Sequence, residues 1–184
     1  MAHDLRPFRD YDEHDVINLF AYSGDSTQVV KGLVVKLEAG FNPGTAVNST
    51  PNTALGSVGA SYANTVSERY GISSRVSTAT SGSNVLGLTL MDVREFDENG
   101  EKLVFNPRKA AEMGVVISGQ SVPVLTRGIV LYSGLAAGTA GDSVYLSSSA
   151  AGDLTTSLVG SSTKVGKLLG SKDSNGFALL KIEL

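Results

Sequence analysis

Side chains that could act as a general base or a nucleophile are few in this chain. Its only histidines, His3 and His14, lie in an acidic stretch at the N-terminus, and the chain has no cysteine. His14 stands between Glu13 and Asp15. Neighbouring side chains of an extended chain point in opposite directions, so we interpret this group as a solvated cluster and not as a metal site. No Gly-x-Ser-x-Gly motif holds a serine at a sharp turn. The sequence therefore predicts no catalytic residue, no metal site, no cofactor and no enzymatic activity.

Two other patterns resemble parts of known sites but differ from them in spacing. Residues 160–168 contain the Gly-Lys pair of a phosphate-binding loop, with one residue too many between the glycines and Leu168 where Ser or Thr would bind magnesium. A group of carboxylates after residue 91 matches no EF-hand loop. A glycosidase needs two carboxylates facing each other across a cleft, whereas members of this group flank a predicted turn, where charges keep a loop solvated. The carboxylates are Asp92, Glu95, Asp97, Glu98 and Glu101.

Composition and charge narrow the range of partners. The 184 residues carry a net charge of −3, and the 15 basic residues are scattered, which argues against a nucleic-acid surface. No apolar run approaches the ~20 residues of a membrane-spanning helix. Residues 1–15 are too polar and acidic for a secretory signal. We therefore expect neither nucleic acid nor a membrane as partner, and without cysteine no disulfide indicates a compartment.

Short apolar segments separated by glycine-containing turns recur about every 8–12 residues, as in small antiparallel β-proteins. The 21 glycines and the many Ser and Thr residues also favour strands and turns over helices. Asn99-Gly100 is the strongest hairpin signal, and residues 107–113 could form one short helical turn. We predict an all-β fold, a single small antiparallel barrel or sandwich over residues 16–184. The expected strands cover residues 16–22, 28–37, 85–96, 102–105, 126–131, 137–146, 163–169 and 177–184.

Two segments do not fit the β-pattern. Residues 1–15 mix acidic side chains with aromatics and arginines, and we interpret them as an extended arm, either disordered as a terminus or ordered on a partner. Residues 39–83 are rich in Gly, Ser, Thr, Asn and Ala and are too long for a structureless loop inside a compact domain. We interpret them as an insertion that lies against another surface. The residues expected at an interface are Phe8 and Tyr11 in the arm and Tyr62, Arg69 and Tyr70 in the insertion.

A weak internal repeat links the two halves of the chain. Residues 30–34 resemble residues 126–130, and residues 85–88 resemble residues 165–168, in the same order. Each of the four segments contains a glycine, which in a strand usually marks a bulge or a close approach of two backbones. Two related β-halves or chance similarity among β-segments would each produce this pattern.

The C-terminal third has a distinctive order of segments. Arg-Gly-Ile-Val (127–130) is followed by Ala-Gly-Asp-Ser-Val-Tyr-Leu (140–146), Lys-Val-Gly-Lys-Leu (164–168) and Ala-Leu-Leu-Lys-Ile (178–182). This order resembles that of the capsid decoration (cement, or head-stabilising) proteins of tailed bacteriophages, over about residues 115–184. The resemblance implies a β-barrel or β-tulip body and no catalytic residue.

The same resemblance implies a structural role in the virion. Such a protein is made in the host cytoplasm, binds the outer capsid surface and bridges neighbouring major capsid subunits, often as a homotrimer or homodimer on the shell. The arm and the insertion would supply bridging contacts, each weak but strong together through avidity. One alternative is another virion component with a similar β-body, such as a head fibre, tail or adaptor protein. A less favoured one is a β-sandwich carbohydrate-binding module, because the chain has no tryptophan to stack on sugars.

Overall fold

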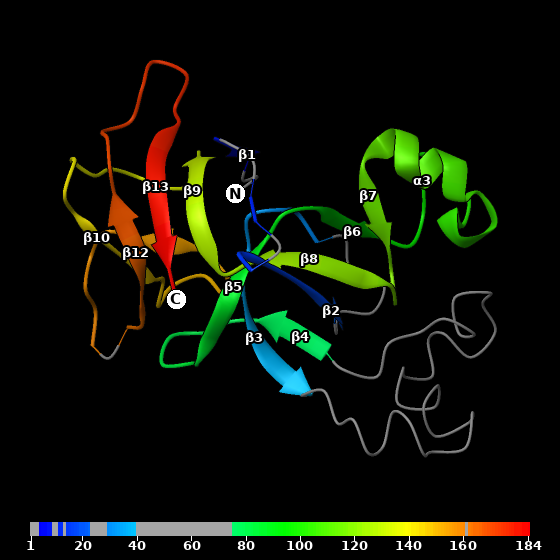
Figure 1. Ribbon diagram of the computed structural model, residues 1–184, viewed down its shortest axis with the longest axis horizontal. Coiled ribbons are helices and arrows are strands. Elements are labelled where there is room, and N and C mark those ends of the chain that lie inside the picture. Colours follow the sequence, from blue (N-terminus) through cyan, green and yellow to red (C-terminus); the bar gives the residue numbers. More distant parts are fainter. Residues whose placement is uncertain (1–3, 9–10, 13, 23–28, 40–74, 161) are drawn as a thin grey trace.

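A computed structural model describes residues 4–8, 11–12, 14–22, 29–39, 75–160 and 162–184. Within these residues the chain is mostly β, with one short α-helix and one 3-10 turn, which confirms the predicted all-β class. The strands form a closed five-stranded barrel, a six-stranded sheet and a small third unit that carries the helix. The barrel lies between the other two (Figure 1).

The barrel comes from the first two thirds of the chain. Its strands, in their order around the ring, are β2 (Val16–Tyr22), β4 (Arg75–Thr78), β3 (Val34–Ala39), β5 (Val85–Thr89) and β8 (Ser121–Leu125). β2 closes the ring because it pairs in parallel with β4 and antiparallel with β8. The remaining pairs are antiparallel. Closure leaves no strand of the ring with an open edge, which removes a common route to aggregation.

The six-stranded sheet is antiparallel throughout and is formed mostly by the C-terminal third. Its strands, in spatial order, are β1 (Leu5–Pro7), β9 (Arg127–Tyr132), β13 (Ala178–Glu183), β12 (Lys164–Leu168), β10 (Ser143–Leu146) and β11 (Leu154–Thr155). Burial alternates along these strands, as in β13, where Leu180 and Ile182 are fully buried while Leu179 and Lys181 are partly exposed. The sheet therefore has an inner face against the core and an outer face turned away from it.

The third unit consists of β6 (Asp92–Arg94), the 3-10 turn η3 (Leu103–Phe105), the helix α3 (Pro107–Met113) and β7 (Val115–Ile117), with β6 and β7 parallel. The helix begins after Asn106, whose side chain accepts a hydrogen bond from the backbone amide of Lys109. Pro107 occupies the first helical position, where its missing amide hydrogen costs nothing. The helix ends at Gly114, which adopts the left-handed conformation with φ 65°.

One hydrophobic core joins the barrel to the six-stranded sheet. Val34, Leu88 and Leu125 from barrel strands pack in the same buried cluster as the inner face of the sheet. A second cluster fills the other side of the barrel and reaches β6 and β7, and a third lies under α3. The sheet contributes Leu5, Val130, Tyr132, Val144, Leu146, Leu154, Val165, Leu168, Ala178, Leu180 and Ile182 to the shared cluster.

The turn at Asn99-Gly100 forms as predicted, but the strand expected after it does not. Phe96 and Lys102 form a single antiparallel bridge, and Gly100 has the positive φ of 82° that the turn requires. Residues 103–105 then form η3 instead of a strand, so the prediction of a strand over residues 102–105 is wrong. The chain has to turn here because Leu103 is buried in the cluster beneath α3, which starts two residues after η3 ends.

Residues in the expected arm and the expected insertion also form strands. β1 lies within residues 1–15 and pairs with β9, with Leu5 opposite Tyr132 and only 2% exposed. β4 lies within residues 39–83 and is a strand of the barrel. The expected strand over residues 28–37 begins later, at Val34, after a turn at Gly32 with φ 88°.

The internal repeat has no counterpart in the strand order. In its first pair, residues 30–34 form the turn that leads into β3 and residues 126–130 lie mostly in β9; its second pair lies at β5 and β12. β3 and β5 are neighbours in the barrel, whereas β9 and β12 are separated by β13. The internal repeat thus relates positions that are not equivalent in the fold, which favours chance similarity over two related halves.

Candidate functional site

The two predicted interface residues of the arm have different environments. Phe8 is 55% exposed, directly after β1. Tyr11 is partly buried against the shared core, and its hydroxyl donates a 2.9 Å hydrogen bond to the carbonyl oxygen of Ile129. Tyr11 therefore holds the arm on the protein's own body, while Phe8 remains accessible to a partner. The predicted interface residues Tyr62, Arg69 and Tyr70 lie outside the described residues.

Asp97 differs from the expectation of a solvated carboxylate. Its side chain is 1% exposed. One carboxylate oxygen accepts 2.8 Å hydrogen bonds from the backbone amides of Asn99 and Glu101, and the other accepts from the ammonium of Lys109 on α3. A buried carboxylate needs partners of this kind. Asp97 thus ties the Asn-Gly turn to the helix.

These contacts set the ionisation of both partners. The hydrogen bond from Lys109, followed by the one from the Glu101 amide, holds the pKa of Asp97 below its ordinary value of 3.8. The hydrogen bond to Asp97 raises the pKa of Lys109 above its ordinary value of 10.5. A lowered carboxyl pKa contributes stability that is complete above the ordinary value and is lost as pH falls through the lowered one.

We expect Asp97→Asn to reduce the acid sensitivity of the fold. The variant loses the ion pair with Lys109 and should unfold at lower urea than the wild type at pH 7. As pH falls below the ordinary carboxyl pKa of 3.8, its midpoint should fall less steeply than that of the wild type, because the proton uptake of Asp97 on unfolding is gone. Urea titrations at several pH values measure this. Glu98→Gln removes a carboxylate of the same turn as a matched control, and equal slopes for wild type and Asp97→Asn would contradict the expectation.

Two of the other candidate carboxylates, Asp92 and Glu95, have partners within the protein. Asp92 accepts a hydrogen bond from the Lys31 amide and pairs with Arg94 at 3.5 Å, and Glu95 pairs with Lys102 at 3.4 Å. Among the described residues no group of three or more His, Cys, Asp or Glu could hold a metal ion. The phosphate-loop-like segment leads into β12 and not into a helix. None of the helices in the described part of the chain is both long and apolar enough to cross a membrane.

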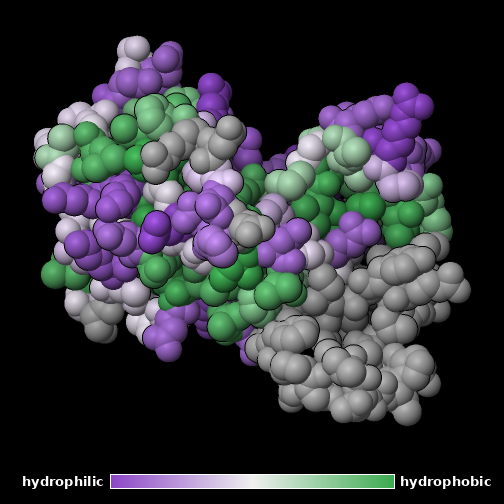
Figure 2. Space-filling model, viewed as in Figure 1, coloured by the Kyte–Doolittle hydropathy of each residue, from purple (hydrophilic) through white to green (hydrophobic). Residues whose placement is uncertain are grey.

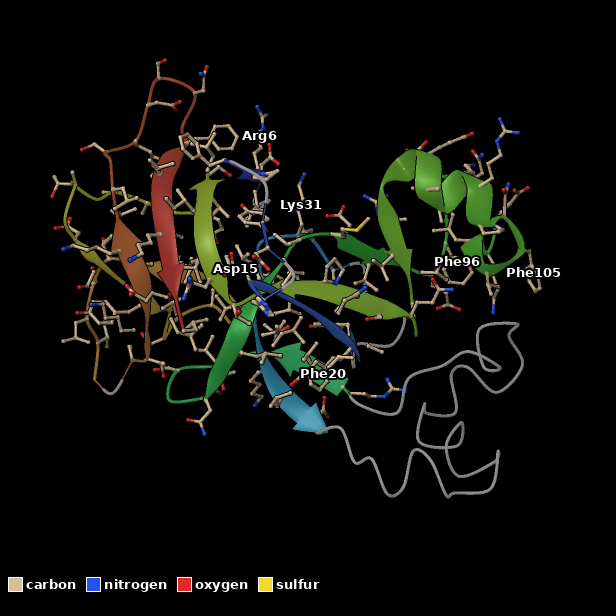
Figure 3. The ribbon with its side chains drawn as sticks, in the orientation of Figure 1. Arg6, Asp15, Phe20, Lys31, Phe96 and Phe105 are labelled. Atoms are coloured by element: carbon tan, nitrogen blue, oxygen red, sulfur yellow. The ribbon has the colours of Figure 1, made fainter. Side chains whose placement is uncertain are left out.

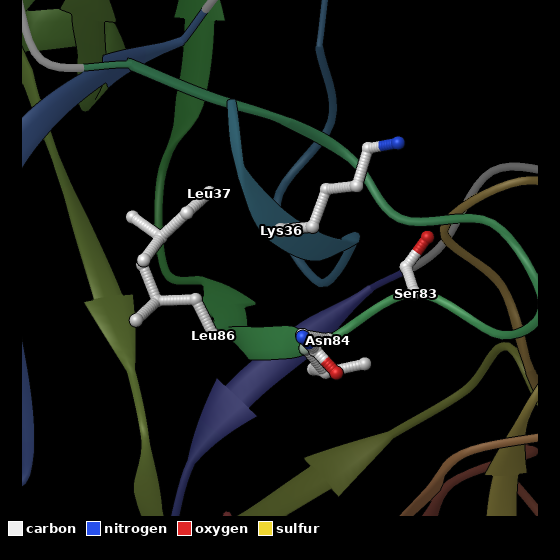
Figure 4. A pocket seen from close by; sticks show the side chains of 6 residues that line it. Lys36, Leu37, Ser83, Asn84 and Leu86 are labelled. Atoms are coloured by element: carbon white, nitrogen blue, oxygen red, sulfur yellow. The ribbon is translucent and has the colours of Figure 1, made fainter. Parts of the chain in front are cut away.

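Among the hollows lined by residues that the structure describes, three are relevant to binding. One of about 410 Å³ lies between the ends of β3 and β5. In it, Leu37 and Leu86 lie together while Lys36 and Ser83 lie on the opposite side (Figure 4). Two more lie on the outer face of the six-stranded sheet. The first of these has a volume of about 330 Å³ and is lined by Arg127, Ile129 and Lys181, among others. The second has a volume of about 530 Å³, and its lining includes Arg6, Leu131 and Phe177. Both linings also contain carboxylates, from Asp15 and Glu183 in the first and from Asp173 in the second, so cationic, anionic and apolar groups lie side by side.

Exposed apolar side chains occur in small groups and not as one patch. Phe105 is 67% exposed and Phe96 41% exposed on the unit that carries α3, where Figure 3 places them on the same side. The Lys102 ammonium lies 5.7 Å from the centre of the Phe96 ring. Leu158 and Val159 project from the loop between β11 and β12. These groups are further candidates for contact with a partner.

No protein-family model, curated protein or solved structure matches this chain. The candidate site therefore rests on the chain's own residues. The outer face of the six-stranded sheet, with the hollows beside Lys181 and Leu131, was missed by the sequence analysis. Its signal was visible as lysines among the apolar residues of 164–168 and 178–183, but strand order was needed to bring them together.

Proposed function

We propose that this protein is a structural virion protein that binds the outer surface of a bacteriophage capsid and bridges neighbouring major capsid subunits. The observation that carries the proposal is the placement of the four segments in which the sequence resembles capsid decoration proteins. They form β9, β10, β12 and β13, which are direct neighbours in one sheet in the order β9-β13-β12-β10. The resemblance falls on one continuous unit and not on scattered pieces.

The architecture suits a bridging role. A protein that bridges capsid subunits has to remain rigid while several subunits exert forces on it. The closed barrel and the core that it shares with the six-stranded sheet supply such a body. Contacts with the shell would come from exposed side chains, with Phe8 on the arm among them. Each contact can be weak, because several engaged at once add through effective concentration.

Binding to isolated heads tests the proposal. Purified protein should co-sediment with expanded heads that lack a decoration protein, and should raise the melting temperature of those heads in calorimetry. A ligand that binds only the assembled shell stabilises it by mass action. Heads whose surface sites are already occupied serve as the control and should retain no added protein. Absence of binding to vacant heads would overturn the proposal.

The main competitor, another virion component with a similar body, gives a different result by electron microscopy. Labelled protein should lie over the whole head surface if it decorates the capsid. Label confined to the tail or to a single vertex would instead assign the protein to a tail, fibre or adaptor structure.

A further inference from the structure

The outer face of the six-stranded sheet carries apolar side chains where a solvated sheet normally carries polar ones. Leu131 of β9 and Leu179 of β13 are directly opposite each other, and both point away from the core. Leu169 lies just beyond β12, and its backbone amide donates a hydrogen bond to the Leu179 carbonyl oxygen. Leu169 itself is 42% exposed. Ile129 lies one step along the same face of β9. In antiparallel sheets with one solvent-exposed face, apolar residues usually face the core and polar residues face the solvent. The aliphatic side chains on this outer face therefore indicate contact with a partner.

The next row of the same face contains Ile129 of β9, which lies opposite Lys181, and two lysines. Lys167 of β12 and Lys181 of β13 are directly opposite each other in the register, and Lys164 lies opposite Tyr145 at the same face of β12. Like charges directly opposite on neighbouring strands destabilise a sheet. Lysines often protect the edge of a sheet from aggregation, but β12 and β13 are the two central strands of this one. The lysine pair therefore does not serve as edge protection, and of its two members Lys181 pairs with Glu183 at 3.3 Å.

The acidic groups around this face leave it positive. Glu183 pairs with Lys181 at 3.3 Å, and Asp15 pairs with Arg127 at 3.5 Å. Asp4 pairs with Arg6 and Lys31 at the β1 end, and Asp173 accepts hydrogen bonds from the amides of its own turn. No carboxylate of the described residues forms an ion pair with Lys164 or Lys167. The chain as a whole is negative, at −3, so the basic face is a local departure from its charge.

Figure 2 shows hydrophobic surface in the upper part of the lobe formed by this sheet, with hydrophilic side chains directly below it. We infer that the outer face of this sheet is a docking surface for an acidic protein surface that presents carboxylates to Lys164, Lys167 and Lys181 and apolar groups to the leucine row. The inference rests on the proposed function, under which the occupant is the outer surface of the major capsid protein. Complementary charge would steer encounter and fix the register of docking.

Other anionic partners fit this face less well. A single-stranded nucleic acid stacks its bases on aromatic side chains, whereas the centre of this face is aliphatic. A membrane surface takes up apolar side chains that penetrate about 5–10 Å into the headgroup region. Ile129, Leu131 and Leu179 are partly buried between their neighbours on a sheet and do not project in that way.

The test compares charge reversal on this face with the same reversal elsewhere. Lys167→Glu places a carboxylate opposite Lys181, so the variant should fold at least as stably as the wild type. Its affinity for vacant expanded heads should fall about tenfold at low ionic strength, and the difference should shrink in about 0.5 M salt, which screens the charges. Arg108→Glu, 90% exposed on α3 at the other end of the molecule, is the matched control and should bind like the wild type. Leu179→Thr keeps strand propensity and should weaken binding in a salt-independent manner.

The outcomes separate this inference from the proposed function. If the wild type binds heads and Lys167→Glu binds equally well, the docking face is wrong while the proposed function stands. If the wild type does not bind vacant heads, the proposed function fails and the capsid is excluded as occupant. If the wild type binds duplex DNA or phosphatidylserine vesicles and Lys167→Glu abolishes that binding, the face belongs to that partner and the inference is overturned. The inference is also overturned if analytical ultracentrifugation shows that the wild type self-associates and Lys167→Glu does not.

Discussion

Replacing Gly166 by alanine is expected to destabilise the protein by more than about 4 kcal/mol, an effect that few single substitutions reach. Gly166 lies in β12 opposite Ile182 of β13. A Cβ atom at this position would overlap with the Lys181 carbonyl oxygen, and would lie 3.1 Å from the Lys181 carbonyl carbon and 3.3 Å from the Ile182 Cα. These are backbone atoms that cannot rotate away, so the two central strands of the sheet would have to separate.

Urea unfolding followed by far-UV circular dichroism measures this effect. Gly170→Ala is the matched control, because a Cβ there would meet only the Leu179 Cβ at 3.8 Å, an ordinary contact. We expect the control to stay within about 0.5 kcal/mol of the wild type. A Gly166→Ala protein with wild-type stability would show that β12 and β13 are not as close as described.

Truncating Leu125 is expected to unfold the barrel and the six-stranded sheet together. Leu125 belongs to the barrel strand β8, has no exposed surface and lies in the cluster that joins the barrel to the sheet. Leu-to-Ala changes at buried sites cost about 2–5 kcal/mol, through lost transfer free energy and the cavity left behind. Because the cluster is shared, we expect Leu125→Ala to lower the stability of both units equally.

Native-state hydrogen exchange distinguishes shared from separate unfolding. Amides of β5 in the barrel and of β13 in the sheet should lose protection by the same factor in Leu125→Ala. Leu158→Ala makes the same chemical change at a side chain that is 62% exposed, and should leave protection unchanged. A loss confined to the barrel would mean that the two units unfold independently.

The glycines show how far local sequence reasoning reaches. From the pattern alone, a glycine inside a strand predicts a bulge or a close approach of two backbones. Both features occur at Gly166, since a register irregularity of the β10–β12 pair lies beside it and the β13 backbone contacts it. Gly87 is equally close to the backbone of Leu125 in the neighbouring barrel strand. The sequence did not indicate which strands would be the neighbours.

The carboxylates after residue 91 show where local reasoning fails. A turn containing Asp97, Asn99 and Gly100 is correctly predicted, because Asn-Gly suits positive φ. The burial of Asp97 is not, because it depends on Lys109 in a helix that packs back over the turn. The outer-face lysines are a similar case, since their repulsion exists only when β12 and β13 are neighbours.

By itself the sequence determined the local elements: the all-β class, most strands, the Asn-Gly turn and the helical turn over residues 107–113. These depend on side-chain alternation, on backbone preference and on caps, all of which lie within a few residues of each other. Only the tertiary structure decided that β1 of the arm pairs with β9, that β4 belongs to the barrel and that leucines and lysines gather on one outer face. The physical reason is that strand pairing joins segments far apart in the chain, and its register depends on how the whole core packs.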